Sequence, residues 1–442
     1  EEEIPFEVPE GWEWTRLGSL FSTITGSTPS TKDASLYGDE YPFYKPTDLD
    51  AGFDVCFSED TVSEKGYKNG RILPVYSVLV TCIGATIGKT GYIRNSGICN
   101  QQINAILPNT FILPEYTYFC MCSEFEQQQI WTNSSATTLP ILNKSKFDSL
   151  FFPVPPKAQQ TRTVERIKEL LHFVEIIQQE KRTLQETIKL TKSKILDLAI
   201  RGKLVPQDPN DEPASVLLER IRTEKEELIK QGKIKRDKKE SIIFRGDDNS
   251  YYLRTGEVEE SLENWRFDDL TETWEICCLC ELCDYGDCIS VNTEDIAEDA
   301  WILDLEDIEK DTGTVLKKVA KAQRNSVSTK HKFHSGQVLY SKLRPYLNKV
   351  VLSDADGYCT SEILPLEFKN CVLPEYARYY LMSGTFIAYA NHCSYGVKMP
   401  RLGTTDGKKA IFSLPPLSEQ KRIVETIDFF FMQLNKISEA LA

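Results

Sequence analysis

Between residues 156 and 200, apolar positions recur at alternating steps of three and four, separated mostly by charged, amide or hydroxyl side chains. A 3.5-residue repeat held over several heptads places the apolar positions in one narrow seam along a helix. The pattern therefore predicts a long helix whose seam is covered by another helix. The seam positions are Ile167, Leu170, Val174, Ile177, Leu184, Ile188, Ile195 and Leu198.

The end of the chain repeats this helix. The segment PPLSEQKRIVETIDFFFMQLNKISEALA, from Pro415, matches PPKAQQTRTVERIKELLHFVEIIQQEKR, which begins 260 positions earlier at Pro155. The shared offset favours one antiparallel pair of duplicated helices; the alternative is two amphipathic helices that each cover their own domain. The second seam consists of Ile427, Phe430, Leu434, Ile437 and Leu441.

Short β-like runs divided by Gly, Pro and Asn precede each helix, for example at 41–49, 77–84 and 101–108, and a helical stretch follows at about 114–131. The second half repeats the first: SVLVTCIGATIGKTGYI (77–93) matches QVLYSKLRPYLNKVVLS (337–353), and LPEYTYF matches LPEYARYY, again 260 positions apart. The openings GWEWTRLGSL (11–20) and NWRFDDLTET (264–273) are matched at an offset of 253. The sequence indicates a tandem duplication.

These patterns predict an α/β (α+β) repeat with pseudo-two-fold symmetry: two similar mixed α/β domains, separated by long helices that form an antiparallel coiled coil. The first domain is expected at 1–155, a central helical spacer at 156–245, the second domain at 246–415 and a C-terminal helical region at 416–442. Within the spacer a charged helix is expected after a Pro/Asp-rich turn; its basic residues favour a solvated face over a DNA-binding region. Residues 240–262 are expected to be a linker.

Composition narrows the function. A net charge of −14 argues against a protein that coats nucleic acid indiscriminately, although local basic surfaces remain possible. No run of about 18 apolar residues and no signal peptide is found, and thirteen cysteines form no small-domain framework. We therefore expect a soluble, cytoplasmic protein with free thiols.

Three windows lack acidic residues: Glu64 to Glu115, Asp311 to Asp354, and Tyr376 to Thr405. The second holds nine Lys and Arg residues, and matching windows in both copies suggest paired phosphate-facing surfaces. The alternative is chance, combined with β-rich cores that exclude charged residues. It accounts for the missing acidic residues but not for the nine Lys and Arg residues. The first seam spans roughly 47 Å at about 1.5 Å per residue, which is longer than the ~34–36 Å of one turn of B-DNA.

Several segments resemble motifs of other chemistry. The segment Gly84 to Thr90 is one residue short of a phosphate-binding loop, and its repeat counterpart has no glycine. The cysteines between Cys277 and Cys288 include only one C-x-x-C, so buried packing is favoured over zinc. No methyltransferase, dinucleotide or zinc-protease motif occurs, and we predict neither a catalytic residue nor a metal site.

Arg and Lys pair well with guanine in the major groove, and Asn and Gln with adenine. Polar residues at equivalent repeat positions in acid-free surroundings are therefore predicted to contact DNA. In the first domain they are Tyr44, Lys45, Lys89, Gln101, Gln102, Asn143 and Lys144; in the second they are Lys342, Arg344, Tyr346, Lys349, Ser361, Tyr395, Lys398 and Arg401.

The chain resembles the specificity (DNA-recognition) subunit of a type I restriction-modification enzyme over nearly its whole length. The residues that carry the resemblance are GWEWTRLGSL, VLVTCIGATIGKTGYI, LPEYTYF, the junctions FPVPPKAQQTRTVERI and SLPPLSEQKRIVETI, and the central DLAIRGKLVPQDPNDEPASVLLERIRTEKEELIKQGKIKRDKK. The twice-seen Pro-Pro-x-x-x-Gln junction is fairly specific, and the central run more so. The second helical region stops at Ala442, which indicates either a truncated chain or short ends that complete the pseudo-symmetry.

The resemblance implies a non-catalytic bacterial or archaeal DNA-binding subunit. Each α/β domain would be a target-recognition domain for one half of a bipartite, asymmetric double-stranded DNA sequence. The helices would set the spacing and dock two methyltransferase subunits, and a restriction/translocase subunit would join them. S-adenosylmethionine, ATP and Mg would be bound only by those partners. The alternatives are a helical protein-interaction scaffold and an anti-restriction relative that reads no DNA.

Overall fold

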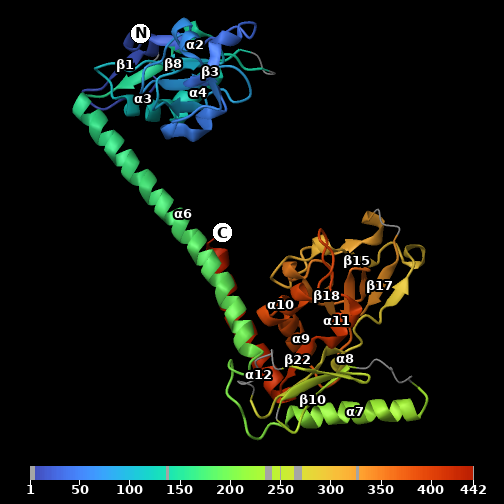
Figure 1. Cartoon of the computed structure of the whole chain (residues 1–442). Helices are drawn as coiled ribbons and strands as arrows, with labels where there is room; N and C mark the ends of the chain where they lie inside the picture. Colours follow the sequence, from blue (N-terminus) through green and yellow to red (C-terminus); the bar gives the residue numbers. More distant parts are fainter. Residues whose placement is uncertain are drawn as a thin grey trace. The chain divides into compact units, whose positions relative to one another are not determined.

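The computed structural model describes residues 5–135, 139–233, 241–248, 250–262, 271–324 and 328–441. The chain divides into two compact units, Glu1–Gln179 and Glu180–Ala442. Helix α6, Lys157–Ala199, is continuous over 43 residues, so it begins in the first unit and ends in the second (Figure 1).

The first unit carries two sheets and a strand pair. Their orders are β2-β8-β5-β6, β4-β3-β7 and β1-β9. The elements are β1 (Glu13–Arg16), α1 (Leu17–Leu20), β2 (Thr23–Thr25), η1 (Ala34–Leu36), β3 (Tyr37–Tyr44), η2 (Asp48–Asp54), β4 (Asp60–Val62), α2 (Glu64–Asn69), β5 (Val78–Thr81), β6 (Thr90–Tyr92), β7 (Ile98–Cys99), β8 (Ile103–Ile106), α3 (Pro114–Met121), α4 (Glu124–Asn133), α5 (Lys144–Asp148) and β9 (Phe151–Val154).

The second unit repeats this arrangement with additions. Its sheets run β19-β18-β21, β14-β17-β20-β15-β16, β13-β22 and β10-β11-β12. Its elements after α6 are α7 (Ala214–Lys230), β10 (Ser241–Arg245), β11 (Tyr251–Thr255), β12 (Val258–Ser261), β13 (Glu275–Cys278), α8 (Leu279–Leu282), β14 (Ile289–Val291), η3 (Thr293–Asp295), β15 (Trp301–Leu303), η4 (Leu305–Asp307), β16 (Val319–Ala320), η5 (Lys321–Gln323), β17 (Lys330–Phe333), β18 (Val338–Ser341), η6 (Pro345–Leu347), β19 (Val350–Leu352), β20 (Gly357–Thr360), β21 (Ile363–Leu366), α9 (Pro374–Leu381), α10 (Gly384–His392), α11 (Thr404–Lys409), β22 (Ile411–Leu414) and α12 (Leu417–Ala440).

The duplication is visible in the elements themselves. Strands β5 and β18, helices α3 and α9, and strands β9 and β22 occupy equivalent places, 260 positions apart. The predicted match of the two openings is wrong, however. Strand β1 pairs with β9, and β13 pairs with β22 in the same register, so Glu13 corresponds to Glu275 at an offset of 262. The segment 264–270, which was matched instead, lies outside the described residues.

This register also places the cysteine cluster. Cys277 and Cys278 belong to β13, Cys280 to α8, and Cys283 follows it. Cys277, Cys278 and Cys283 are buried; burial raises the pKa of the Cys277 and Cys283 thiols, and a hydrogen bond that the Cys278 thiol shares with Cys280, followed by burial, raises that of Cys278. The cysteines therefore fill the position that the opening strand and helix fill in the first unit.

The predicted linker at 240–262 is also wrong, because described residues from 241 onward form the antiparallel sheet β10-β11-β12. Its apolar residues Ile243, Leu253 and Leu262 pack with Ile276 of β13 and Ile411 of β22. The alternation of apolar residues over a short run, rather than overall polarity, decides the structure here. The sheet thus extends the core of the second unit.

Each α/β core is tied to its helix by one buried glutamine, an arrangement we call the glutamine clasp. Gln160 accepts a hydrogen bond from the Leu113 amide (2.8 Å) and donates to the Phe111 and Pro155 carbonyls. Gln420 makes the same contacts 260 positions later: it accepts from the Leu373 amide (2.8 Å) and donates to the Cys371 and Pro415 carbonyls. The Pro-Pro-x-x-x-Gln junction thus has a structural cause, since a buried glutamine satisfies three backbone groups at the helix start.

The predicted antiparallel helix pair is present where α12 runs back along the end of α6 within the second unit (Figure 1). Ile195 and Ile423 lie in one buried cluster, and Lys192 donates to the side chain of Asn435 (2.6 Å). Phe431, rather than the predicted Phe430, packs against this cluster, one turn after the buried Ile427.

The predicted seam is covered only toward that end. Ile188, Ile195 and Ile427 are buried, and Ile167, Leu198, Leu434 and Leu441 are partly buried. Exposed seam side chains are Leu170, Val174, Ile177 and Leu184 on α6 and Phe430 and Ile437 on α12.

Candidate nucleic-acid interface

Three segments of the second unit meet beside the end of β18. They are the turn that follows the strand (342–349), the connection between β20 and β21 (361–362), and the hairpin after α10 (394–402); we call them the three-segment surface. Backbone hydrogen bonds join them: Lys342 N to Glu362 O (3.0 Å), Leu402 N to Lys342 O (3.0 Å), Arg344 N to Pro400 O (2.7 Å), Tyr395 N to Arg401 O (3.1 Å) and Arg401 N to Tyr395 O (3.0 Å).

The first unit has the same surface beside β5, from segments 82–89, 101–102 and 134–142, of which 136–138 lie outside the described residues. Every bond recurs 260 positions earlier: Cys82 N to Gln102 O (2.7 Å), Leu142 N to Cys82 O (2.8 Å), Gly84 N to Pro140 O (3.0 Å), Ser135 N to Ile141 O (2.9 Å) and Ile141 N to Ser135 O (3.1 Å). The two surfaces therefore share one backbone framework while most of their side chains differ.

All eight DNA-contact residues predicted in the second domain lie on this surface. Tyr346, Ser361, Tyr395 and Lys398 are exposed there, and Lys342 and Arg344 are half-buried; Arg401 is half-buried in a bidentate pair with Glu362 (2.9 and 3.0 Å). That ion pair and its hydrogen bonds raise the pKa of Arg401. In the first unit Gln101 and Gln102 occupy the equivalent of Ser361 and Glu362. Gln101 accepts from the Thr28 hydroxyl, and Gln102 accepts from Asn100 (2.9 Å).

The other predicted contacts are either buried or already engaged within the protein. Tyr44 is fully buried, its hydroxyl donates to the Asn95 carbonyl (2.9 Å), and burial raises its pKa, so its side chain is a core residue and not a DNA contact. Asn143 caps α5 by accepting from the Lys146 amide (2.9 Å), and Lys144 pairs with Asp148.

Three further lysines on the predicted DNA face are engaged within their own unit. Lys45 pairs with Asp60, and Lys89 pairs with Asp50 (2.6 Å). Lys349 donates to the Leu305 carbonyl (2.6 Å), and burial lowers its pKa. For these lysines to contact phosphate, an internal interaction must first be replaced.

The acid-free windows are acid-free along the chain but not in space. Arg324 contacts Asp304, Glu306 and Asp307, and Lys318 pairs with Asp354 (2.7 Å). Within the same window Lys321 pairs with Glu298, Lys317 approaches Asp307, and Lys330 is buried. In the first unit, Lys65, Lys68 and Arg94 are likewise paired with Asp33, Glu64 and Asp54. Residues outside each window supply these acids, so the excess of positive charge along each window does not form a broad unpaired basic surface; that the windows face phosphate stays a prediction.

Sequence reasoning missed exposed apolar side chains on the hairpins. Val397 and Met399 stand out from the second hairpin, and Leu139 occupies the position of Met399 in the first. Such side chains can contact a thymine methyl group or a base face. The signal that could have found them is an apolar residue in a short segment bounded by Gly396 and Pro400, where no core position is expected.

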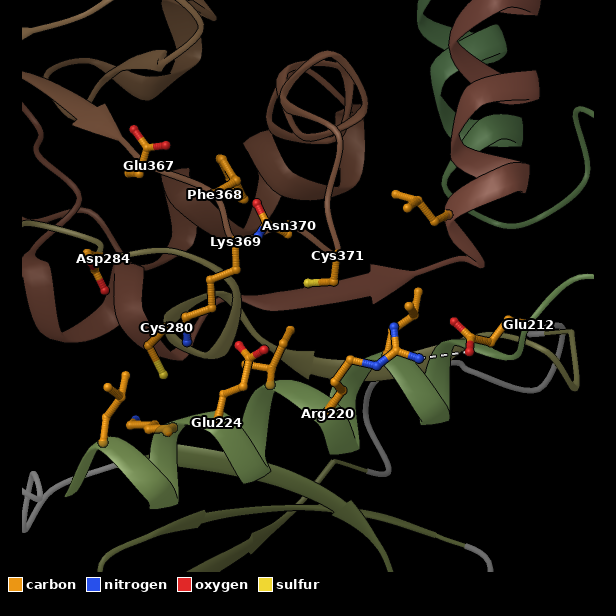
Figure 2. A pocket seen from close by; sticks show the side chains of 15 residues that line it. Glu212, Arg220, Glu224, Cys280, Asp284, Glu367, Phe368, Lys369, Asn370 and Cys371 are labelled. Atoms are coloured by element: carbon orange, nitrogen blue, oxygen red, sulfur yellow. Dashed lines mark hydrogen bonds and ion pairs between the residues drawn. The ribbon is translucent and has the colours of Figure 1, made fainter. Parts of the chain in front are cut away.

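A separate pocket of about 610 Å³ lies between α7 and the loop after β21 (Figure 2). Its lining mixes both signs of charge, and Arg220 pairs with Glu212 across one end (2.8 Å). Cys280 and Cys371 also line it. Among the residues that the structure describes, no group of three or more His, Cys, Asp or Glu side chains is placed to hold a metal ion.

The fold and the duplicated surface define a protein that presents two related recognition domains on a helical scaffold. Comparison with known families agrees: the model of the type I restriction modification DNA specificity domain matches residues 9–186 and 271–441. The chain belongs to this family, as its sequence motifs predicted. Members recognise specific DNA sequences, assemble with other subunits and are themselves non-catalytic.

Relatives extend over nearly the whole chain. It is 22% identical to the type I restriction enzyme EcoDI specificity subunit of Escherichia coli, covering 98% of this chain and 84% of that protein. It is 25% identical to the EcoAI specificity subunit of the same species, covering 99% and 80%. Among solved structures, the HsdS subunit from Thermoanaerobacter tengcongensis matches with a TM-score of 0.57 at 16% identity, covering 100% of this chain and 94% of that one. This structural likeness confirms the predicted fold class.

None of the helices within the described ranges is both long enough and apolar enough to span a membrane.

Proposed function

We propose that each unit reads one half of a bipartite, asymmetric DNA target through its three-segment surface. The observation that carries this proposal is the pair of identical backbone hydrogen-bond frameworks with different side chains. Gly84, Gln102 and Ile141 stand where Arg344, Glu362 and Arg401 stand. A fixed backbone with exchanged side chains is what two readers of different base sequences require, because base edges are distinguished by side-chain donors and acceptors.

The side chains on the two surfaces suit different bases. Lys342, Arg344 and Lys398 supply donors for guanine or phosphate in the second unit, and Gln101 and Gln102 supply the amide pattern that suits adenine in the first. Tyr346 and Tyr395 are more than half exposed and can stack or donate. The remaining proposed contacts are Lys45, Lys89, Asn143, Lys144, Lys349, Ser361 and Arg401. All except the exposed Ser361 would have to exchange a present interaction within the protein for one with DNA.

We further propose that the helices dock two methyltransferase subunits, through which a restriction/translocase subunit joins. Exposed Leu170, Val174 and Ile177 on α6 support this, because contiguous apolar surface marks a protein-interaction site. The proposed division is 1–155 and 246–415 for recognition and 156–245 and 416–442 for the helices, with β10–β12 extending the second domain forward to 241. S-adenosylmethionine, ATP and Mg belong to the partners, and the assembly works on genomic DNA in the cytoplasm of a bacterium or archaeon.

The proposal is tested by co-expressing the chain with the methyltransferase encoded beside it and mapping methylated adenines in the host DNA. We expect one two-part motif with a fixed gap. Replacing Lys342 and Lys398 together by Ala should weaken methylation at that motif, whereas replacing the ion-paired Lys317 and Lys318 should leave it unchanged as a matched control. Equal effects of the two double variants would show that the three-segment surface is not the reader.

A second candidate is a helical scaffold that joins proteins without reading DNA, which the exposed apolar positions of α6 also favour. It predicts a stable complex with the methyltransferase and no motif-specific methylation. That result would overturn DNA reading while retaining the helix as a docking surface.

A further inference from the structure

The turn after β18 holds two residues in the left-handed backbone region. Arg344 has φ +50° and ψ +64°, and Asn348 has φ +49° and ψ +54°. Their counterparts in the first unit are both glycines with positive φ, Gly84 (+103°) and Gly88 (+88°). Glycine adopts such angles without a steric penalty, so the first copy uses the residue that the turn prefers.

Arginine is disfavoured at this position for two reasons. A side chain at positive φ brings Cβ against the backbone, and a residue that precedes proline is pushed towards extended angles; Arg344 precedes Pro345. The backbone bond from its amide to the Pro400 carbonyl (2.7 Å) holds the conformation in place. Backbone strain of this kind concentrates at functional sites.

The side chain of Arg344 serves no evident structural purpose that would explain this strain. Its Nε is shielded from solvent and has no hydrogen-bond partner among the described residues. The neighbouring Arg401, by contrast, is occupied by Glu362. Arg344 is therefore an arginine on the three-segment surface with an unmet donor, on a backbone that would be more relaxed with glycine.

We infer that Arg344 is the specificity-determining residue of the second unit and that it binds a guanine base; this inference rests on the proposed function. The planar guanidinium donates two parallel hydrogen bonds to guanine O6 and N7, a match that fixes both position and orientation. A phosphate contact needs no such placement, since any exposed lysine on a relaxed backbone can make it. The left-handed backbone sets the direction in which the side chain leaves the turn.

The test compares Arg344→Gly with Asn348→Gly in the complex with the methyltransferase. Both changes put glycine where the first unit has it, and both relax a left-handed backbone, although only Arg344 also precedes a proline. Asn348 is buried and donates to the Met382 carbonyl (3.3 Å), so its substitution controls for changes in the turn itself. Arg344→Gly should keep the thermal unfolding midpoint of the unmodified chain, whereas its methylation motif should lose one guanine in one half.

Binding to a duplex that carries the mapped motif gives the second measurement. The unmodified protein should bind between about 5-fold and 150-fold less tightly when 7-deazaguanine, which lacks N7, replaces that guanine. Arg344→Gly should not distinguish the two duplexes. An unchanged motif for Arg344→Gly, or a uniform loss of affinity across all sequences with a shallower salt dependence, would overturn the inference. Failure of the unmodified protein to produce any motif would instead overturn the proposed function.

Discussion

The two three-segment surfaces are built on the same hydrogen bonds yet present different side chains. In the first unit Gly84 and Gly88 shape the turn and leave little side chain there, and amides fill the adjoining connection. In the second unit Arg344 and Asn348 adopt the same class of backbone angles, and a carboxylate and an arginine pair beside them. The comparison teaches that the backbone framework does not depend on the side chains it displays, because its bonds run between amides and carbonyls.

The interiors of the two units also share a backbone arrangement but differ in one side chain, at the start of helices α4 and α10. Ser123 and Ser383 cap helices α4 and α10 by accepting from the amide three residues on, which belongs to Glu126 in one unit and Phe386 in the other. The side chains of Glu126 and Phe386 are both buried. One copy thus encloses an ionisable group where the other encloses a ring, although the helix start is the same.

Replacing the clasp glutamine should produce the largest effect, and an equal one in each unit. Gln160→Ala and Gln420→Ala each leave one amide and two carbonyls without a buried partner, which should lower the free energy of unfolding of that unit by about 4 kcal/mol. Hydrogen exchange at the amides of the buried core strands β5 and β18 reads each unit separately. A small loss in one unit and a large loss in the other would show that the two clasps are not equivalent.

Raising the pH should destabilise the first unit more than the second, in which burial also raises the pKa of Glu275 and Glu419 but by less. Burial raises the pKa of Glu126 to about 8 despite a hydrogen bond from Cys120, so the folded unit holds a proton that the unfolded chain releases near its ordinary value of 4.5. Its contribution to stability is complete below that value and is lost as the pH rises towards about 8, at about 1.4 kcal/mol per pH unit. Denaturant titrations across this range should show the slope, and Glu126→Gln should remove it.

Two tryptophans at matched positions should respond differently to substitution. Trp274 donates to Glu419 (2.9 Å), whereas the indole nitrogen of Trp12 is buried without a partner among the described residues. Trp274→Phe should cost about 1–2 kcal/mol more than Trp12→Phe, because both changes remove similar volume but only one breaks a hydrogen bond. Unit-resolved hydrogen exchange measures the difference, and equal costs would contradict it.

The smallest effect is expected from giving the first unit a side chain in its turn. A Cβ at Gly84 meets no atom nearer than Gln102 Nε2, at 3.9 Å, so Gly84→Asn adds strain without a clash. The first unit should lose about 1 kcal/mol or less of stability. Thermal unfolding checks this loss; a loss of several times that size would mean that the first turn, unlike the second, tolerates only glycine.

Sequence patterns predicted much of the architecture because the duplicated segments keep their apolar spacing. The offset shared by Val78 and Val338, and by Gln160 and Gln420, follows from cores and clasps that both units need. The opening of the second unit keeps Trp12, Glu13 and Leu17 as Trp274, Glu275 and Leu279, at an offset of 262. Its position was predicted wrongly because this offset differs by two from the 260 of the rest of the repeat, and because Cys277 and Cys278 replace Thr15 and Arg16.

The candidate site was less predictable because it depends on contacts between distant residues. Tyr44 was predicted to contact DNA, but its side chain is buried in the core. Arg324 lies in an acid-free stretch of sequence, but acidic residues of another segment contact it. The strain at Arg344 is likewise invisible in the sequence, although its alignment with Gly84 points to it. Charge counted along the chain was therefore a poor guide to charge in space.

The glutamine clasp also bears on how such chains can change over generations. Apart from the glutamine itself, every group in it is a backbone amide or carbonyl, so the clasp makes no demand on the side chains that a domain displays. A domain exchanged at the Pro-Pro step would inherit the same rotational phase between its core and the departing helix. The junction thus allows a whole domain, and with it the sequence that the domain recognises, to be exchanged. The contacts that fix the domain to the start of its helix would stay the same.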